Sequence, residues 1–519
     1  MRTNVPEHVD VVIIGAGLSG IGAACHLERR CPGRTYAILE GRESIGGTWD
    51  LFRYPGVRSD SDMHTLGYSF APWTDERTIA DGPSILRYIH ATADEYGVKD
   101  HIRFGHRVTG AAWASRDARW TVTAERDGEG PATLTASFVL FCTGYYRYDQ
   151  GFDPGFDGRE RFPGPVVHPQ HWPQDLDYAG KRVVVIGSGA TAITLVPALA
   201  EQAAHVTMLQ RSPSYLVSLP GEDPVASRLR RRLPSMAAYQ AVRWKNVALM
   251  TLSYRLCRRY PKLAKQVLRK GVLRQVPSDL DVDTHFKPRY NPWDQRMCVC
   301  PDGDFFSALR SDRATIVTDE VDTFTETGIR LRSGQELEAD IIVIATGLNL
   351  LALGGTEVTV DGRDLDLPHR LTYKGLMLDA TPNAALVIGY TNASWTLKAD
   401  LTCEYVCRVL NHMSAHGYDT AVPVCDQASV TPRPLLDLDS GYVLRSVDQF
   451  PRQGSEPPWR LRQNYPRDIV TLRTGKIDDG VLRFSRRTEA AASAGQAAAS
   501  AGQAAASADQ AGVPAVLPA

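Results

Sequence analysis

The sequence predicts an α/β fold with two Rossmann-like dinucleotide-binding domains and a helical insert. Two stretches, residues 9–30 and 181–201, share one pattern, in which a short β-branched run leads into a glycine-rich turn and then a helical stretch. A third stretch, residues 224–278, has a helical pattern. The length of 519 residues is too great for one simple core and predicts two or three domains.

The composition excludes several classes of protein. Hydrophobic residues make up 43% and charged residues 23%, which argues against a disordered, fibrous or membrane-embedded chain. The formal net charge of -1 argues against a globally basic, nucleic-acid-binding protein. No window reaches the roughly 18 apolar residues of a membrane-spanning helix, and the first residues lack the pattern of a secretory signal. Nine scattered cysteines, with no zinc-site spacing, predict a reduced, cytoplasmic protein without a bound metal.

The first glycine turn has the features of a dinucleotide site. Gly15 permits the tight turn, Gly17 lets the backbone approach a pyrophosphate, and Gly20 lets the helix pack on the strand. The helix N-terminus, at Ser19, offers unpaired N–H groups to phosphates. Glu40 follows the second strand, 20 residues after Gly20, where a carboxylate meets a ribose hydroxyl. A lone glycine turn would be weak evidence, but the strand, glycines, helix and acid together predict a nucleotide site.

The second glycine turn, residues 187–192, follows the strand at residues 181–186. The next strand ends in Arg211 and Ser212 rather than in an acid. A cation there fits a ribose 2′-phosphate, which predicts NADPH; the alternative is that Arg211 is an ordinary surface residue. Two dinucleotide sites in one chain predict one bound flavin, one exchanging nicotinamide, and hydride transfer from NADPH to FAD.

The segment between the two sites narrows the class. Its pattern F-x-G-x-x-x-H-x-x-x-W-P places Phe162, Gly164, His168 and Trp172 at fixed spacing. The alternative is a proline-rich linker with an incidental histidine, which the position between two nucleotide motifs disfavours. The pattern resembles the fingerprint of type I Baeyer–Villiger monooxygenases, whereas related monooxygenases of nitrogen and sulfur centres have Tyr or Phe at the position of Trp172.

The resemblance covers roughly residues 8–485 and is closest to the ethionamide-activating monooxygenase subgroup. Residues 53–60, 291–296 and 389–401, and the stretch near Tyr442, also resemble family segments. The resemblance implies that a flavin C4a-peroxide transfers one oxygen atom of O2 to a small apolar ketone, giving an ester or lactone. It also implies that Arg296 stabilises the developing charge and that Asp60 pairs with Arg296. Without the resemblance, Asp60 would be interpreted as a turn residue.

The sequence features bear differently on the other functions of a two-nucleotide flavoprotein. S- or N-oxygenation of thioamides, thioethers or amines by the same flavin peroxide stays open as the alternative. An NADPH-dependent reductase would not need the linker fingerprint, and a regulatory flavoprotein would not need Arg296 and both intact glycine turns. Disulfide chemistry at the flavin is not expected, because residues 49–57, which follow the Gly46-Gly47 pair, contain no cysteine.

The predicted cofactor contacts surround the two glycine turns. Gln295 stands where many family members carry a lysine before the active-site arginine, so Arg211 and Ser212 are expected to hold the phosphate with a weaker preference for NADPH. The full set of predicted contacts is Gly15, Gly17, Ser19, Gly20, Glu40, Gly47, Thr48, Trp49, Asp50, Leu51, Asp60, Val108, Gly187, Ser188, Gly189, Ala190, Thr191, Ala192, Arg211 and Ser212.

The predicted domain organisation splits the FAD domain in two. Residues 1–150 form its first part, residues 151–340 the NADPH domain with a basic helical insert at 221–280, and residues 341–485 the second part with the substrate entrance. Residues 486–519 form an Ala-rich, low-complexity tail.

The basic insert concentrates the positive charge of the chain. Of the 58 Lys and Arg residues, 14 lie in residues 224–278, which contain no Asp or Glu. Three interpretations stay open: the insert steers anionic NADPH to its site, it contacts an anionic membrane surface peripherally, or it is a solvated face over a local core.

Overall fold

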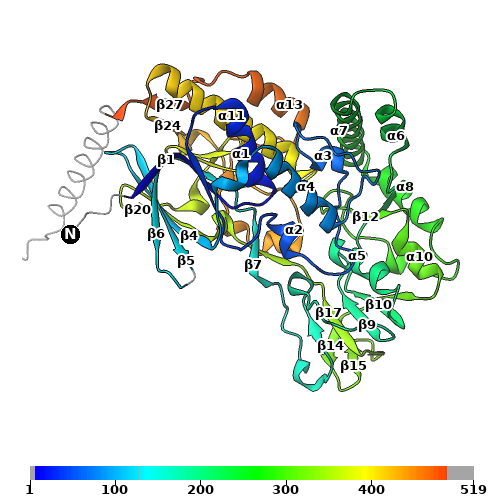
Figure 1. The fold of residues 1–519 in the computed structure, drawn as a ribbon. Coiled ribbons are helices and arrows are strands. Elements are labelled where there is room, and N and C mark those ends of the chain that lie inside the picture. The colour runs from blue at the N-terminus through cyan, green and yellow to red at the C-terminus, as the bar shows by residue number, and fades with distance from the viewer. Residues whose placement is uncertain (1–5, 127, 488–519) are drawn as a thin grey trace, which may run out of the picture.

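The computed structural model describes residues 6–126 and 128–487, and most of the predicted Ala-rich tail lies outside these residues (Figure 1). The α/β fold expected from the sequence is confirmed. It contains two separate sheets, and each includes one of the two strands that lead into a glycine turn. In Figure 1, the second sheet lies below and to the right of the first, and the insert helices stand at the right-hand edge.

The first sheet has the strand order β20-β19-β4-β5-β6-β1-β2-β3, with β23 also paired to β6. The pairs β1–β2, β1–β6, β2–β3 and β6–β23 are parallel, whereas β4, β5 and β6 form an antiparallel meander. The strands are β1 (Glu7–Ile14), β2 (Tyr36–Leu39), β3 (Ile102–Arg103), β4 (His106–Ala114), β5 (Arg119–Arg126), β6 (Ala132–Phe141), β19 (Glu357–Val360), β20 (Arg363–Asp364) and β23 (Ala384–Leu386).

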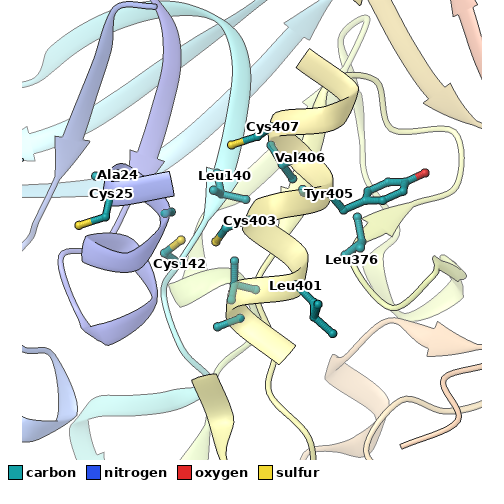
Figure 2. Close-up of a cluster of buried hydrophobic side chains, with 14 of the residues drawn as sticks. Ala24, Cys25, Leu140, Cys142, Leu376, Leu401, Cys403, Tyr405, Val406 and Cys407 are labelled. Carbon is teal, nitrogen blue, oxygen red and sulfur yellow. The ribbon is translucent and has the colours of Figure 1, made fainter. Parts of the chain in front are cut away.

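Helices α1 (Leu18–Arg30) and α11 (Trp395–His416) pack together, although they are far apart in the sequence. Their shared core contains buried cysteines from both helices and from the end of β6 (Figure 2). Burial raises the pKa of the Cys25 thiol to about 12 and that of Cys142 even further, so these thiols stay protonated and behave as small apolar groups. The Cys403 and Cys407 thiols, next to each other on α11, are free and buried.

The second sheet is entirely parallel, with the order β13-β10-β9-β17-β8. Its strands read as continuous apolar runs because helices such as α5 (Ala190–Leu199) and α10 (Asp304–Arg310) cover it. A small antiparallel sheet of β14 (Val321–Phe324), β15 (Gly328–Leu331) and β16 (Glu336–Glu338) adjoins it. The five strands are β8 (Val166–Val167), β9 (Arg182–Ile186), β10 (His205–Gln210), β13 (Ala314–Thr318) and β17 (Ile341–Ile344).

The chain crosses twice between the two sheets, and the two crossing segments pair with each other. Strand β7 (Tyr146–Gly151) leaves the first sheet, and β18 (Leu348–Leu350) returns to it as the antiparallel partner of β7. The Thr346 hydroxyl donates to the carbonyl of Phe152 at 2.7 Å and strengthens this junction. The path from one sheet to the other is therefore a hydrogen-bonded ribbon rather than a loose linker.

The basic insert folds as three helices, α6 (Pro224–Arg230), α7 (Ser235–Arg259) and α8 (Pro261–Leu273). The first half of α7 is tied to α3 (Met63–Leu66) and its C-cap, because the buried Arg243 donates to the carbonyls of His64 and Gly67 at 2.7 and 2.8 Å. The insert is thus not a purely solvated basic arm, since one of its cations belongs to the core. Across the described residues, no helix is both long and apolar enough to cross a membrane.

Short elements complete the structure. Strands β11 and β12 form a parallel pair that joins the insert to the segment after Arg296. The remaining elements are α2 (Thr48–Leu51), α4 (Gly82–Glu95), α9 (Val282–His285), α12 (Gly441–Leu444), α13 (Tyr465–Ile469), the π-helical turn η8 (Val470–Thr474), β11 (Leu216–Leu219), β12 (Cys298–Pro301), β21 (Thr372–Tyr373), β22 (Met377–Leu378), β24 (Thr420–Pro423), β25 (Arg433–Pro434), β26 (Arg452–Gln453) and β27 (Leu482–Ser485).

Candidate active site

A cavity of about 380 Å³ extends from the first glycine turn to the start of α5. One end is bordered by Glu40 and by residues 106–108 of β4, and the other by Arg296 and Thr191. It therefore connects the nucleotide motif of the first sheet with that of the second. The predicted site residues in its wall are Gly15, Gly17, Ser19, Glu40, Gly47, Thr48, Trp49, Asp60, Val108, Ala190, Thr191 and Arg296.

The glycines of the first turn are required by close backbone contacts. A Cβ atom on Gly20 would lie 1.8 Å from the Gly15 carbonyl oxygen, so any side chain there would push the turn away from α1. Gly15 has a φ of +99°, and a Cβ on it would lie 2.9 Å from the Cys142 carbonyl oxygen. Gly17 and Gly47 face each other, with a Cβ on Gly47 falling 3.1 Å from the Gly17 Cα. The turn thus presents bare backbone to the cavity at the N-terminus of α1.

Glu40 closes the other side of this turn. Its carboxylate accepts N–H groups from Ala16 at 2.6 Å and from Arg42 at 2.9 Å. The side chain is buried, and this burial raises its pKa, while the two N–H groups act in the opposite direction. A fixed carboxylate at the end of β2 is suited to accept the hydroxyl groups of a ribose.

Arg296 and Asp60 form an ion pair at the opposite end of the cavity. Nη1 of Arg296 lies 3.1 Å from Oδ2 of Asp60, and Nε and Nη2 donate to the carbonyls of Thr391 and Ala393 at 3.4 and 3.5 Å. The Asp60 carboxylate raises the pKa of the guanidinium, which therefore stays charged at every working pH. About a third of the Arg296 side chain is exposed, so a cavity ligand can reach it.

The chain presents Arg296 from a strained turn that the sequence did not reveal. Trp293 has a φ of +72°, a region that bulky residues rarely occupy. The turn is closed by a hydrogen bond from the Asn291 N–H to the Asp294 carboxylate at 2.8 Å. Arg258 of α7 binds the other carboxylate oxygen of Asp294 at 2.6 Å. The insert therefore helps to hold the turn that carries Arg296.

Aromatic side chains line the cavity near Arg296, and the sequence patterns missed two of them, Tyr145 and Tyr146. Tyr145 and Tyr146 follow β6, and their tilted rings lie 4.6 Å apart between centroids, while Tyr145 packs on Trp395 at 5.1 Å. Trp395 donates its indole N–H to the Ser19 hydroxyl at 2.7 Å. These rings form an aromatic wall of the cavity that contains the guanidinium. In the sequence, the only sign of these rings is that aromatic residues stand in or close to the segments that resemble the family.

A second cavity, of about 430 Å³, shares Asp60 and Arg296 with the first. Its lining is largely apolar and comes from α7, through Leu249 and Met250, and from Leu219 and Met297. A polar rim at Asp62, Asn246 and Ser394 adjoins the shared ion pair. Arg296 thus stands where the two cavities meet.

The second glycine turn lies on an open surface. A Cβ on Gly187, whose φ is +144°, would lie 2.3 Å from the Ala345 carbonyl oxygen, whereas one on Gly189 would meet no atom within 4 Å. The Ser188 hydroxyl donates to the Ser212 carbonyl at 2.8 Å and ties the turn to the end of β10. Arg211 is exposed and forms no ion pair within the described residues. Its guanidinium is thus available beside the turn.

The fingerprint residues lie outside both cavities and organise the crossing between the sheets. His168 accepts the Gln170 N–H at Nδ1, and its Nε2 lies 3.1 Å from the Gly347 carbonyl oxygen, which fits a neutral ring with a proton on Nε2. Burial lowers its pKa in support of the neutral form. Trp172 is buried in the core of the second sheet, and a Cβ on Gly164 would lie 2.4 Å from the Asp340 carbonyl oxygen.

The other predicted cofactor contacts lie beside the cavities rather than in their walls. Asp50 is buried, and its carboxylate is occupied by Arg42 and Arg53. The remaining members of this group are Gly20, Leu51, Gly187, Ser188, Gly189, Ala192, Arg211 and Ser212.

The two nucleotide motifs, joined by the fingerprint and sharing one cavity, define a flavin-dependent monooxygenase. Residues 8–240 match the family described as flavin-binding monooxygenase-like. The FAD-containing monooxygenase EthA of Mycobacterium tuberculosis is 56% identical over 482 residues, which are 93% of this chain and 98% of that one. EthA of Mycolicibacterium smegmatis is 53% identical over 489 residues, 94% of this chain and 99% of that one. The chain belongs to the flavin-binding monooxygenase-like family.

Solved structures share the whole fold at low sequence identity. An oxidised steroid monooxygenase bound to NADP is 24% identical, with a TM-score of 0.74 over 92% of this chain and 100% of that one. The monooxygenase OTEMO in complex with FAD and NADP is 24% identical, with a TM-score of 0.68 over 82% of this chain and 88% of that one. Both matches cover most of this chain and therefore show that these two structures share its fold.

Proposed function

We propose that this monooxygenase uses FAD and NADPH to insert one oxygen atom of O2 next to the carbonyl of an apolar ketone, giving an ester or lactone. The observation that carries the proposal is the position of Arg296, paired with Asp60 where the cavity of the nucleotide motifs meets the apolar cavity. A cation fixed between cofactor and substrate stabilises negative charge that develops on the transferred oxygen and on the carbonyl oxygen.

The residues of the first cavity fit FAD. The bare backbone of Gly15 and Gly17 leaves room for a pyrophosphate at the N-terminus of α1, and Glu40 stands at the distance from that turn expected for a ribose contact. The aromatic wall of Tyr145, Tyr146 and Trp395 suits a flavin ring. When bound there and reduced by NADPH, FAD supplies the activation of O2.

Arg211 supports the choice of NADPH. It is exposed, carries no ion pair within the described residues, and follows β10, where a carboxylate would select the unphosphorylated ribose of NADH. Gln295, whose side chain donates to the Asp439 carbonyl at 3.4 Å, adds no charge. We expect Arg211→Ala to bring the ratio of kcat/KM for NADPH and NADH close to one. An unchanged ratio would contradict this assignment.

The residues around Arg296 have defined tasks in this proposal. Asp60 and the carbonyls of Thr391 and Ala393 fix the guanidinium, so its charge needs no rearrangement when the transition state forms. The apolar lining of the second cavity, from Leu249 and Met250, favours a ketone that carries an extended apolar group. Tyr145 and Trp395 keep water away from the reacting atoms.

S- or N-oxygenation of a thioamide, thioether or amine is the second candidate. The preference for ketones depended on the identity of Trp172, but this side chain is buried in the core of the second sheet and lines neither cavity. It therefore has no direct contact through which to select the substrate. The same cavity suits a sulfur-containing substrate of similar shape.

A panel of cyclic, linear and aryl ketones, together with thioethers and thioamides, tests both candidates. NADPH consumption and product are measured for each substrate. Ketone insertion predicts one ester per NADPH, and heteroatom oxygenation predicts one S-oxide or N-oxide per NADPH. Stoichiometric NADPH oxidation that yields hydrogen peroxide with every substrate would contradict both.

We also propose that the basic insert contacts an anionic membrane surface. Leu252 and Leu256 on α7 and Leu263 and Val267 on α8 are about half exposed or more, an unusual gathering of large apolar side chains. The exposed cations among them, which form no ion pair within the described residues, are Arg255, Arg259, Lys262 and Lys270. Leu249 belongs both to this surface and to the lining of the second cavity, which gives apolar substrates a direct route.

Vesicle co-sedimentation tests this surface. The protein should bind phosphatidylglycerol vesicles more strongly than phosphatidylcholine vesicles, and Leu252→Glu combined with Leu256→Glu should abolish the binding. Val424→Glu, which changes an equally exposed apolar residue elsewhere, is the control. Binding that is insensitive to salt and to anionic lipid would contradict the proposal. Self-association in solution that the double variant disrupts would assign the surface to a second copy of the chain.

A further inference from the structure

A third cavity, of about 440 Å³, shares no lining residue with the two cavities at Arg296. Five segments far apart in the sequence converge on it: the end of α1, the chain after α3, the middle of α7, the middle of α11, and α13 with η8. We call it the arginine cavity after its lining, which includes Arg29, Arg30, Arg243, Arg408 and Arg473. The fingerprint and the nucleotide motifs make no use of it.

The arginine cavity holds more positive charge than its own carboxylates balance. Arg30 and Arg473 share one partner, Glu404, at 3.0 Å each. Arg408 donates to the backbone carbonyls of Leu472 and Gly475, and Arg29 lies over the ring of Phe70. Neither Arg408 nor Arg29 forms an ion pair among the described residues. Concentrated like charge of this kind destabilises a protein unless an anion balances it.

Arg243 adds a deeply buried guanidinium to the wall of this cavity. Only 2% of its surface is exposed, and one amino group, Nη1, is occupied by backbone carbonyls. Nη2 lies 3.5 Å from the Asp400 carboxylate, which also binds His26 and the Ser69 N–H, and among the described residues neither Nη2 nor Nε has a hydrogen-bond acceptor. The charge of Arg243 is therefore only partly satisfied by the protein, and partly satisfied polar groups at this depth are costly.

We propose that the arginine cavity binds a phosphoryl group with at least two negative charges. Guanidinium groups match phosphate oxygens with paired N–H donors, and several of them together select a multiply charged anion over a single carboxylate. Trp244 and Tyr465, whose rings are 6.0 Å apart in the wall, offer an apolar surface for the group that carries the phosphate. The source is a soluble phosphorylated molecule or a phospholipid headgroup, since both offer the same oxygens.

An anion in this cavity would connect the insert to the first sheet. Gln240, Arg243 and Trp244 lie on the same helix, α7, as the Leu249 and Met250 lining of the second cavity. Binding would therefore hold α7 against α11. The side chains of α7 that line the second cavity would then occupy a narrower range of positions. The expected functional effect is a change in KM for the apolar substrate.

Calorimetric titration of the FAD-loaded enzyme with inorganic pyrophosphate tests the proposal, with saturating NADP+ present to occupy the Arg211 site. We expect one saturable site, and Arg29→Gln or Arg30→Gln should weaken it about tenfold. Arg116→Gln, which changes an exposed arginine in the turn between β4 and β5, has the same charge change and should leave the affinity unaltered. Arg243→Lys is kept as a third variant, with its melting temperature measured because it is buried.

Vesicles distinguish the two sources of the phosphoryl group. Pyrophosphate binding that depends on Arg29 and Arg30 assigns the cavity to a soluble ligand. Binding that occurs only with phosphatidic acid vesicles, whose phosphomonoester headgroup carries up to two negative charges, and is lost in the same variants while Arg116→Gln keeps it, assigns it to a lipid headgroup. The proposal is overturned if neither probe binds, or if Arg29→Gln and Arg30→Gln bind both probes as tightly as Arg116→Gln does.

Discussion

Replacement of Arg296 tests the role of the guanidinium at the junction of the two cavities. In Arg296→Met the chain keeps a side chain of similar length, but Asp60 loses its partner and the developing charge loses its cation. Removal of one donor that stabilises charge in a transition state costs about 10²–10³ in kcat, or about 2.7–4 kcal/mol. Arg296→Lys restores a positive charge, but a lysine cannot reach Asp60 and both carbonyls at once. Its kcat should therefore be about tenfold higher than that of Arg296→Met and still below that of the wild type.

The assay separates oxygen transfer from flavin reduction. Product formation is followed by gas chromatography, and anaerobic reduction of the bound flavin by NADPH is followed by stopped-flow absorbance. Both Arg296 variants should reduce the flavin within about threefold of the wild-type rate. Arg330→Met, which removes an exposed arginine paired with Asp322, is the control. Product formation within threefold of wild type in Arg296→Met, or an equal loss of flavin reduction, would refute the assigned role.

Three further predictions concern cofactor retention, packing and pH. Glu40→Gln removes the buried carboxylate and should weaken FAD binding about tenfold, measured as the flavin-to-protein absorbance ratio after dialysis; full retention would contradict it. Gly164→Ala places a Cβ against the Asp340 carbonyl and should lower the free energy of unfolding by about 1–3 kcal/mol, measured by denaturant titration. Gly189→Ala places its Cβ in open space and should not lower it, so equal stabilities of the two variants would contradict this prediction. Burial lowers the pKa of His168, so the unfolded chain binds more protons below pH ~6.5. Stability should therefore fall between pH 7.5 and 5.5, and less steeply in His168→Gln; identical slopes would exclude His168 as a contributor.

The sequence was sufficient to predict the parts of the site that depend on short segments. A glycine turn between a strand and a helix has few alternative conformations, so the placement of Gly15, Gly17 and Gly20 followed from local rules. Glu40 followed because the distance between the turn and the end of β2 is determined by the intervening helix. The pairing of Arg296 with Asp60 depended on the family resemblance, since 236 residues separate them.

The remaining features depend on contacts between distant segments, which no local pattern encodes. The fingerprint identified the class, yet its side chains fix the crossing between the sheets rather than line a cavity. The helical pattern of the insert was correct, but only tertiary packing decides that Arg243 is buried while Leu252 and Leu256 are exposed. The arginine cavity needs five segments to converge, so its charge density cannot be seen in any single stretch.

Isotope labelling under ¹⁸O2 determines whether the chain transfers one oxygen atom of O2 to its substrate. The purified enzyme is incubated with NADPH and a converted ketone in unlabelled water, and the product is analysed by mass spectrometry. We expect one ¹⁸O atom in each ester, and one ester for each NADPH consumed. An ester that carries oxygen only from water, or NADPH oxidation that yields labelled hydrogen peroxide without product, would contradict it.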